Sequence, residues 1–126
     1  MTKELNEKTF AETIKKGIVF VDFWATWCGP CKAFTPIYER VAEKHPDIVF
    51  GKVNTEDESS ISSAFQITAI PTLMIFRDGV PVFSQAGMLP ERALDDLVGK
   101  VRELDMDEVR KQIAEHEEQH DAAAQS

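Results

Sequence analysis

The spacing of apolar residues along the chain predicts helices that alternate with strands. The first predicted element is a helix with Asn6 as its N-cap and an apolar face formed by Leu5, Phe10 and Ile14. Residues 18–24 follow as an almost continuous apolar run, rich in β-branched and aromatic residues and interrupted by a single acid. Such a run is typical of a strand that is buried on both faces of its sheet.

The middle of the chain repeats this alternation. Residues 28–44 carry apolar side chains at helical spacing, so we expect an amphipathic helix that is kinked at the internal Pro36. A break at residues 45–47 precedes a predicted strand over residues 48–53. Residues 54–65 begin with polar residues and end with apolar ones at helical spacing, which indicates a further helix.

After this point the pattern changes to a hairpin. Residues 72–76 are typical of a buried strand, and residues 77–80, Arg-Asp-Gly-Val, form a hairpin signal. Pro81 cannot donate to a ladder, so we expect the next strand to lie at the sheet edge and to end at Gly87. A helix then begins near Pro90. This order of elements indicates a mixed sheet covered by helices on both faces, an α/β fold.

The length, charge and hydropathy of the chain disfavour several classes of function. A length of 126 residues allows one domain with one core. The chain carries 14 basic and 22 acidic residues, a net charge of -8, which disfavours binding to nucleic acids and to anionic membranes. Residues 1–8 lack the apolar stretch of a signal peptide, and no apolar run is long enough to span a bilayer. We therefore expect a soluble cytoplasmic protein whose two cysteines are not a structural disulfide.

The two cysteines, Cys28 and Cys31, stand directly after the buried strand, at the start of the next predicted helix. The free N–H groups and the dipole of a helix start stabilise a thiolate, so we expect the pKa of Cys28 to fall below its ordinary value of roughly 8.5. Cys31 shares a helix face with Cys28 and is expected to be less exposed. Cys28 is therefore the expected nucleophile, and Cys31 the residue that resolves the mixed disulfide. Gly29 lets a partner chain approach closely, and Pro30 stiffens the loop.

A Cys-x-x-Cys pair also occurs in haem and zinc sites. Haem attachment requires histidine after the second cysteine, and Lys32 stands there instead. A zinc site requires two more ligands, and the chain has no further cysteine. A non-catalytic metal-binding or chaperone-like module remains the non-redox alternative. It predicts stoichiometric zinc and unfolding by chelators, neither of which a disulfide reductase shows.

Asp22 is the single acid within the apolar strand, where a carboxylate is costly unless it is paired or neutral. Burial would raise its pKa, which suits a group that takes the proton of Cys31 during the second attack, through water. Lys52, in the next predicted strand, is expected to lie near Asp22 and to moderate this shift. The alternative is that Asp22 caps a local backbone group or faces solvent at a strand end.

Residues 21–32, Val-Asp-Phe-Trp-Ala-Thr-Trp-Cys-Gly-Pro-Cys-Lys, resemble the active-site segment of the thioredoxin family. Further matches follow in the family's order along the chain: Pro36, Lys52, Ile70-Pro71-Thr72 and Gly87. The resemblance covers residues 1–104. It therefore implies a thioredoxin domain over these residues, with residues 105–126 as an acidic, helical C-terminal extension.

This resemblance implies a central five-stranded mixed sheet flanked by four helices. It also implies that the peptide between Ile70 and Pro71 is cis and packs against the cysteines. The family binds the substrate chain on a flat apolar patch, which corresponds here to Trp27, Gly29, Pro30, Ala69, Ile70, Pro71 and Gly87. Many relatives have glycine in place of Ala69, a departure that we expect to alter substrate preference at most.

The resemblance also implies an activity. A Gly-Pro pair between the cysteines occurs in reducing members, which favours a general cytoplasmic protein-disulfide reductase over an oxidase or isomerase. Such proteins need no cofactor besides their own cysteine pair, and a flavoprotein, thioredoxin reductase, reduces them again with electrons from NADPH. We expect a monomer that serves several disulfide-containing client proteins. The alternative is a thioredoxin-fold protein dedicated to one partner, with its C-terminal extension setting the specificity.

The C-terminal extension begins with a capping signal at Asp105 and continues with apolar residues at helical spacing, which predicts an extra helix that frays over residues 121–126. Residues 116–120, His-Glu-Glu-Gln-His, match the H-E-x-x-H motif of zinc proteases. That motif needs a buried helix and a third ligand, and the remaining histidine, His45, lies in a predicted loop. We therefore interpret the motif as a solvated polar face and expect no metal.

Overall fold

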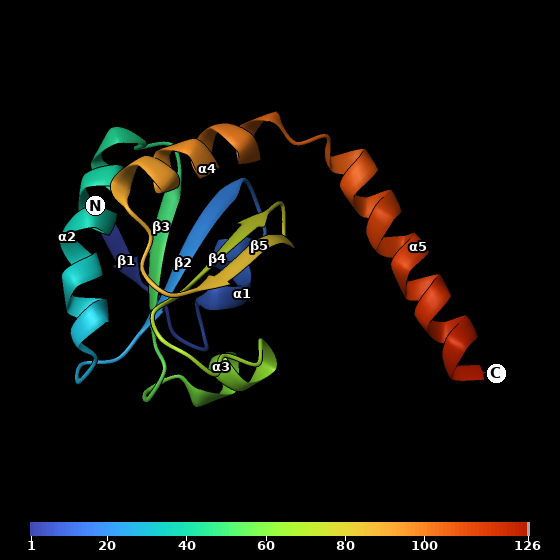
Figure 1. The fold of residues 1–126 in the computed structure, drawn as a ribbon, viewed down its shortest axis with the longest axis horizontal. Helices are drawn as coiled ribbons and strands as arrows, with labels where there is room; N and C mark the ends of the chain where they lie inside the picture. The colour runs from blue at the N-terminus through green and yellow to red at the C-terminus, as the bar shows by residue number, and fades with distance from the viewer. Residues whose placement is uncertain (126) are drawn as a thin grey trace.

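The computed structural model describes the backbone of residues 1–125 and the side chains of residues 1–117. Within these residues, five strands form one mixed sheet in the order β1-β3-β2-β4-β5, accompanied by five helices (Figure 1). The elements are, in chain order, β1 (Thr2–Glu4), α1 (Phe10–Ile14), β2 (Ile18–Trp24), α2 (Gly29–Lys44), β3 (Val49–Asn54), α3 (Ser59–Ala64), β4 (Thr72–Arg77), β5 (Val80–Ala86), α4 (Glu91–Glu103) and α5 (Met106–Gln125). The expected α/β fold is confirmed, including its extra C-terminal helix.

A layer of helices covers each face of the sheet. Strand β2 lies in the middle, and its side chains point alternately to the two faces. Phe20 faces the layer of α2 and α4, where it joins one apolar cluster with Tyr38 and Leu94. Val19 and Val21 face the layer of α1 and α3 and belong to a second cluster. The prediction of a strand buried on both faces is confirmed.

The start of the chain differs from the prediction. Residues 2–4 form β1, which pairs with β3 in parallel, and Leu5 is a buried residue that follows this strand. The side chain of Asn6 accepts the backbone N–H groups of Lys8 and Thr9 at 2.9 and 3.0 Å. Asn6 therefore starts a turn, and α1 begins only at Phe10. The placement of Leu5 on the first helix is wrong, because a strand of three residues is too short to leave a recognisable pattern.

The helix predicted over residues 54–65 is present only as the shorter α3. The side chain of Asn54 accepts the backbone N–H of Glu56 at 3.0 Å, and the resulting turn delays the helix until Ser59. The helix then ends at Ala64, where the following Phe65 is its C-cap.

The predicted hairpin and edge strand are both confirmed. Strands β4 and β5 pair antiparallel through Asp78 and Gly79, whose φ values of 52° and 85° are those of a tight hairpin turn. Strand β5 is the last strand of the sheet, so Pro81, which has no backbone N–H to donate, lies on an edge strand and not on an inner one. The pairing is irregular between Ile75 and Phe76, opposite this proline.

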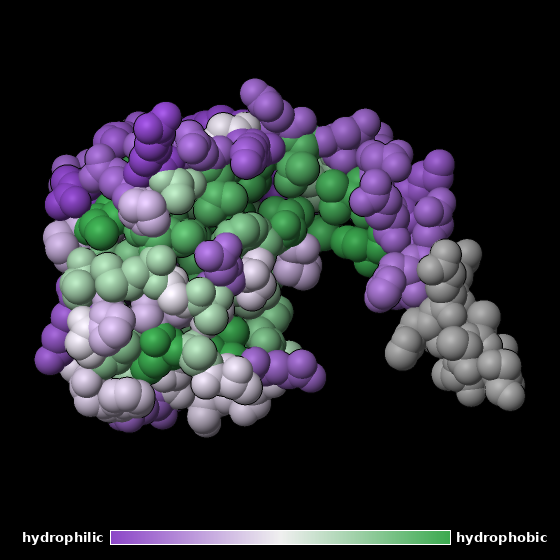
Figure 2. Space-filling model, in the orientation of Figure 1, coloured by the Kyte–Doolittle hydropathy of each residue, from purple (hydrophilic) through white to green (hydrophobic). Residues whose placement is uncertain are grey.

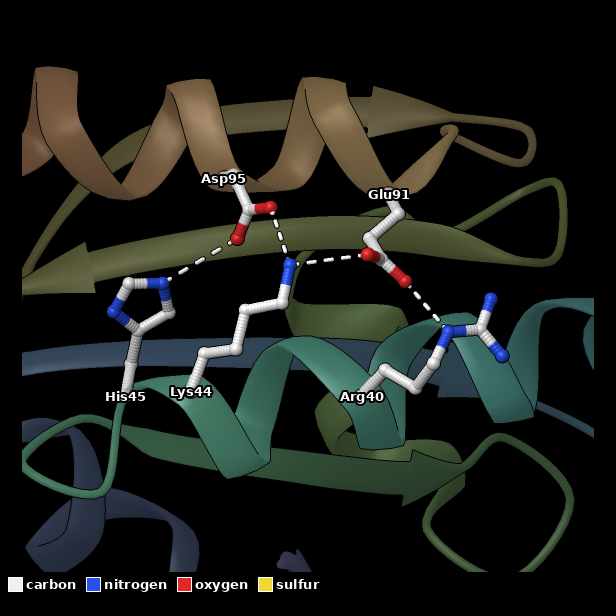
Figure 3. A network of polar contacts seen from close by, with 5 residues as sticks. All are labelled: Arg40, Lys44, His45, Glu91 and Asp95. Carbon is white, nitrogen blue, oxygen red and sulfur yellow. Dashed lines mark hydrogen bonds and ion pairs between the residues drawn. The ribbon is translucent and has the colours of Figure 1, made fainter.

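Charged side chains join α2 to α4 at the surface (Figure 3). Glu91 of α4 lies 2.6 Å from Arg40 Nε and 3.0 Å from Lys44 Nζ. Asp95, one turn further along α4, lies 2.8 Å from Lys44 Nζ and 3.4 Å from His45 Nε2. Each exposed pair is weak by itself, but together they favour one register between the two helices.

Helix α5 extends away from the sheet beyond its β5 edge (Figure 1). Asp105 accepts the backbone N–H groups of Asp107 and Glu108 at 3.1 and 3.2 Å, so the predicted cap is present. Met106 is buried, and Figure 2 shows apolar surface that runs from the domain onto the inner side of the first turns of α5. The fraying predicted for residues 121–126 falls where side chains are not described. Among the described residues, no helix has the length and apolarity that a membrane crossing requires.

Candidate active site

The two cysteines lie where β2 gives way to α2. Cys28 is the N-cap of α2, with an extended backbone at φ −87° and ψ 111°. Its Sγ accepts the backbone N–H of Cys31 at 3.2 Å, as the oxygen of an ordinary N-cap side chain would. The two Cα atoms are 5.3 Å apart, and the two sulfurs are joined in a disulfide. This position at the positive end of a helix favours a thiolate on Cys28 once the disulfide is reduced.

The two sulfurs differ in surroundings more than in exposure. Cys28 is 4% exposed and Cys31 is 1% exposed, so the expected difference in exposure is small. Cys28, however, is flanked by exposed residues on both sides: by Trp27, which is 66% exposed, and by Gly29 and Pro30. A partner chain can therefore reach the region of Cys28, whereas Cys31 faces the interior.

The loop before β4 packs against the cysteines. The peptide between Ile70 and Pro71 is cis, as the resemblance implied. Ile70 packs against the cluster of Ala25 and the two cysteines, and its carbonyl oxygen lies 3.8 Å from Cys28 Sγ. Gly87 donates its backbone N–H to the carbonyl of Pro71 at 2.8 Å, and its φ of 96° favours glycine. Residues from three separate segments thus meet at one end of the sheet.

An open hollow beside Cys28 contains most of the remaining predicted patch. Trp27, Ala69 and Ile70 line it, together with Thr55, Ile67 and Thr68. The indole N–H of Trp27 donates to the carboxylate of Glu56, which orients the exposed ring. Sequence reasoning missed Glu56, because its approach to Trp27 depends on how the loop after β3 folds back.

Asp22 lies in the interior and pairs in register with Lys52 of β3. It is 0% exposed, and neither of its carboxylate oxygens accepts a hydrogen bond from the side chains and backbone that the structure describes. The alternative of a local cap or a solvent-facing strand end is therefore excluded. Burial raises the pKa of Asp22 to about 7; the positive charge of Lys52 opposes this rise, and the negative charge of Glu4 adds to it.

The H-E-x-x-H match at residues 116–120, which we interpret as a solvated polar face, has described side chains only at His116 and Glu117. Among the described residues, no group of three or more His, Cys, Asp or Glu side chains is arranged to hold a metal ion. His45 contacts Asp95 in the surface network, and His116 lines a groove beside β5. The side chain of His120 lies outside the described residues.

Comparison with known proteins agrees with this geometry. The family profile described as Thioredoxin matches residues 1–116. A protein of Streptomyces coelicolor named "Putative thioredoxin 2" is 55% identical over 119 residues, which are 94% of this chain and 89% of that protein. The thioredoxin of Chlamydia pneumoniae is 37% identical over 100 residues, 79% of this chain and 98% of its own length.

The chain belongs to the thioredoxin family. A solved structure agrees with this assignment: a mutant thioredoxin from Halobacterium salinarum superimposes with a TM-score of 0.75 at 31% identity, covering 82% of this chain and 91% of that one. Thioredoxins are thiol–disulfide oxidoreductases, and the pair of Cys28 and Cys31 gives this thioredoxin the same chemistry. The family needs no cofactor for it and generally works with thioredoxin reductase and disulfide-containing clients.

The C-terminal extension is partly shared with one relative. The Streptomyces match spans 119 residues, more than the 104 of the predicted domain, so it includes part of residues 105–126. The Chlamydia match is shorter than that domain. The domain boundary at residue 104 remains a prediction, and the family profile continues past it into α5.

Proposed function

We propose that this thioredoxin is a general protein-disulfide reductase of the cytoplasm in which Cys28 attacks and Cys31 resolves. The observation that carries the proposal is the position of Cys28 as N-cap of α2, next to the exposed Trp27 and the hollow beside it. The Gly-Pro pair between the cysteines, which occurs in reducing members of the family, also supports it. The partners are several disulfide-containing proteins and an NADPH-dependent thioredoxin reductase, and the protein acts as a monomer.

The first step forms a mixed disulfide. The Cys28 thiolate attacks one sulfur of the client disulfide, so that a bond between Cys28 Sγ and this sulfur forms while the client S–S bond breaks. The other client sulfur leaves with the electron pair and takes up a proton. Trp27, Gly29, Pro30 and the segment of residues 69–71 receive the client chain during this step, with Gly87 supporting Pro71.

The second step releases the client. The Cys31 thiol gives its proton to Asp22, through water, and the thiolate then attacks Cys28 Sγ. The bond between the two cysteines forms, the bond from Cys28 to the client breaks, and the second client sulfur leaves with the electron pair and takes up a proton. The client gains two electrons and two protons, and the protein ends in the disulfide form that the structure shows.

Single replacements of the two cysteines test these roles. Cys28→Ser is expected to abolish exchange, because no nucleophile reaches the client. Cys31→Ser is expected to accumulate a stable mixed disulfide with the client, visible as a higher-mass band on non-reducing gels. Equal trapping by both variants would contradict the assignment. Reduction of the pure protein by a thioredoxin reductase with NADPH, followed as NADPH consumption, tests the proposed electron source.

The second candidate is a thioredoxin dedicated to one partner through its extension. A groove between α5 and the edge strand supports it, lined on α5 by Val109, Gln112, Ile113, His116 and Glu117 and on the domain by Pro81, Val82 and Leu104. None of these groove residues belongs to the proposed substrate patch, so the extension would act as a separate contact. If truncation after Leu104 lowers activity on a native partner but not on an unrelated disulfide protein, the dedicated role is supported.

A further inference from the structure

A row of three charged side chains crosses three neighbouring strands on the face covered by α2. Glu4 of β1 stands opposite Lys52 of β3, and Lys52 stands opposite Asp22 of β2. Directly opposed residues of neighbouring strands point to the same face. That face carries Phe20 and Trp24, two positions before and after Asp22, and Trp24 packs against the cysteine cluster. The three charges therefore share one layer with the redox pair.

Exposure increases along this row. Asp22 is fully buried, Lys52 is half-buried and Glu4 is exposed. Glu4 and Trp24 line an open polar hollow whose other walls are Leu5, Asn6, Asn54, Asp57 and Glu58. Glu4 is therefore the end of the row that contacts solvent, and Asp22 is the end that does not.

The ammonium of Lys52 contacts the ring of Trp24 instead of forming a close ion pair with either carboxylate. Its Nζ lies 4.7 Å from the centroid of the Trp24 ring, a cation–π contact. Asp22 accepts no hydrogen bond from it. The Lys side chain has a flexible four-carbon stem, so the charges of its two neighbours decide how far the ammonium moves toward Asp22. A negative charge at Glu4 would favour positions of the ammonium farther from Asp22, and loss of that charge would favour positions closer to it.

The directions of the pKa shifts show that the three groups interact electrostatically. Burial raises the pKa of Glu4, while the charge of Lys52 and the nearby indole of Trp24 lower it. The charge of Glu4, in turn, raises the pKa of Asp22. Further titratable groups on neighbouring elements are Tyr38, Glu39 and Cys31 of α2 and Asp57 before α3. Tyr38 stays neutral because burial raises its pKa well above the ordinary value, and Leu73, the β4 partner of Asp22, does not titrate.

We propose that Glu4 is a positioning residue of the exchange reaction: by holding Lys52 away from Asp22, it sets how readily Asp22 accepts the proton of the Cys31 thiol. The inference rests on the proposed function, in which this proton passes to Asp22 before the Cys31 thiolate attacks Cys28. Glu4 touches neither substrate nor sulfur. Its influence runs through Lys52, which links it to Asp22 in register.

The test measures the titration of Asp22 by carboxyl NMR in the full-length reduced protein. Glu4→Gln is expected to lower the midpoint of Asp22 by about 0.3 to 1 pH unit, the range for an ammonium that moves about 1 to 2 Å closer to a carboxylate at an effective dielectric constant of about 20. The pH profile for release of a mixed disulfide should shift downward by the same amount. Glu4→Asp keeps the charge and should retain most of the parental midpoint.

Glu12→Gln provides the matched control. It makes the same chemical change and the same change in net charge on α1, which lies on the opposite face of the sheet. Its shift should stay below about 0.1 pH unit because intervening solvent and salt screen it. An equal shift in Glu4→Gln and Glu12→Gln, or none in either, would overturn the proposal.

Lys52→Met tests the route of the effect. In this background Glu4→Gln should shift the Asp22 midpoint by less than half as much as in the parent, because the mobile charge is gone. A full shift in the absence of Lys52 would show that Glu4 acts directly through space, and this also overturns the proposal. The titration needs no enzymatic activity, so a parent that fails to reduce disulfides contradicts the proposed function and leaves the Glu4 measurement readable.

Discussion

Replacing Asp22 with asparagine should remove a loss of stability that the native protein suffers as the pH rises. The pKa of Asp22 is about 7 in the folded protein, against an ordinary value of 3.8, with burial as the largest cause. Below the lower value the carboxyl group is protonated in the folded and unfolded states alike. Between the two values the folded protein keeps a proton that the unfolded chain has released, so stability falls with rising pH and levels off above the higher value.

The size of this effect follows from the gap between the two pKa values. One proton difference changes the free energy of unfolding by about 1.4 kcal/mol per pH unit. Across a gap of roughly three units, the native protein loses about 4 kcal/mol between about pH 4 and pH 8. Asparagine does not titrate, so the stability of Asp22→Asn relative to the parent should rise by this amount over the same range.

Urea unfolding of the oxidised proteins at a series of pH values measures the difference, because the disulfide removes both cysteine titrations. Asp96→Asn, an exposed position on α4, is the control for loss of one negative charge. The pH-dependent part is the informative quantity, since a buried amide without partners adds a constant cost of its own. If the free-energy curves of Asp22→Asn and the parent run parallel from about pH 4 to about pH 8, the reasoning about Asp22 is refuted.

Two further predictions concern packing and the extension. Gly51→Ala should lower the free energy of unfolding by about 1–3 kcal/mol, because its Cβ would lie 2.6 Å from Cδ1 of the buried Leu5, whose side chain would have to shift within the packed core. An unchanged urea midpoint would contradict this. Truncation after Leu104 should leave the rate of reduction of an unrelated disulfide protein within about twofold, because α5 lines a groove away from the substrate patch. A tenfold loss of rate would show that the extension takes part in general catalysis.

The sequence predicted the long elements well and the short ones poorly. Strand β2 is an almost continuous apolar run, and the helices α2 and α4 carry apolar residues at helical spacing over several turns. Patterns of this length remain recognisable even where a single residue departs from them. Strand β1 has three residues, two of them charged, and owes its existence to pairing with β3. Asn6 was predicted to cap the first helix and residues 54–65 to be helical, but the side chains of Asn6 and Asn54 begin turns, and α1 and α3 start only after them.

The residues of the site also differ in how well the sequence predicts them. The cysteine pair and Asp22 could be predicted because their meaning is local: two thiols at a helix start and an acid within an apolar strand. The substrate patch around Ile70, Pro71 and Gly87 came only from the family resemblance, since three separate segments form it. Glu4 left no signal in the sequence, because its link to Lys52 exists only once β1 lies beside β3.

The charges that join α2 to α4 on the surface of this protein are closely paired, whereas the buried carboxyl group of Asp22 is not. On the surface, the α2–α4 network matches each acid with a base at hydrogen-bond distance, and water lowers the cost of any mismatch (Figure 3). In the interior, Asp22 has a base on the neighbouring strand but no hydrogen bond, although a paired carboxylate would be more stable. A close pair with Lys52 would return the pKa of Asp22 toward its ordinary value, and the carboxylate would then be too weak a base to take a thiol proton near neutral pH. The stability lost at Asp22 is therefore a consequence of the same burial, without a close cation, that equips it for proton transfer.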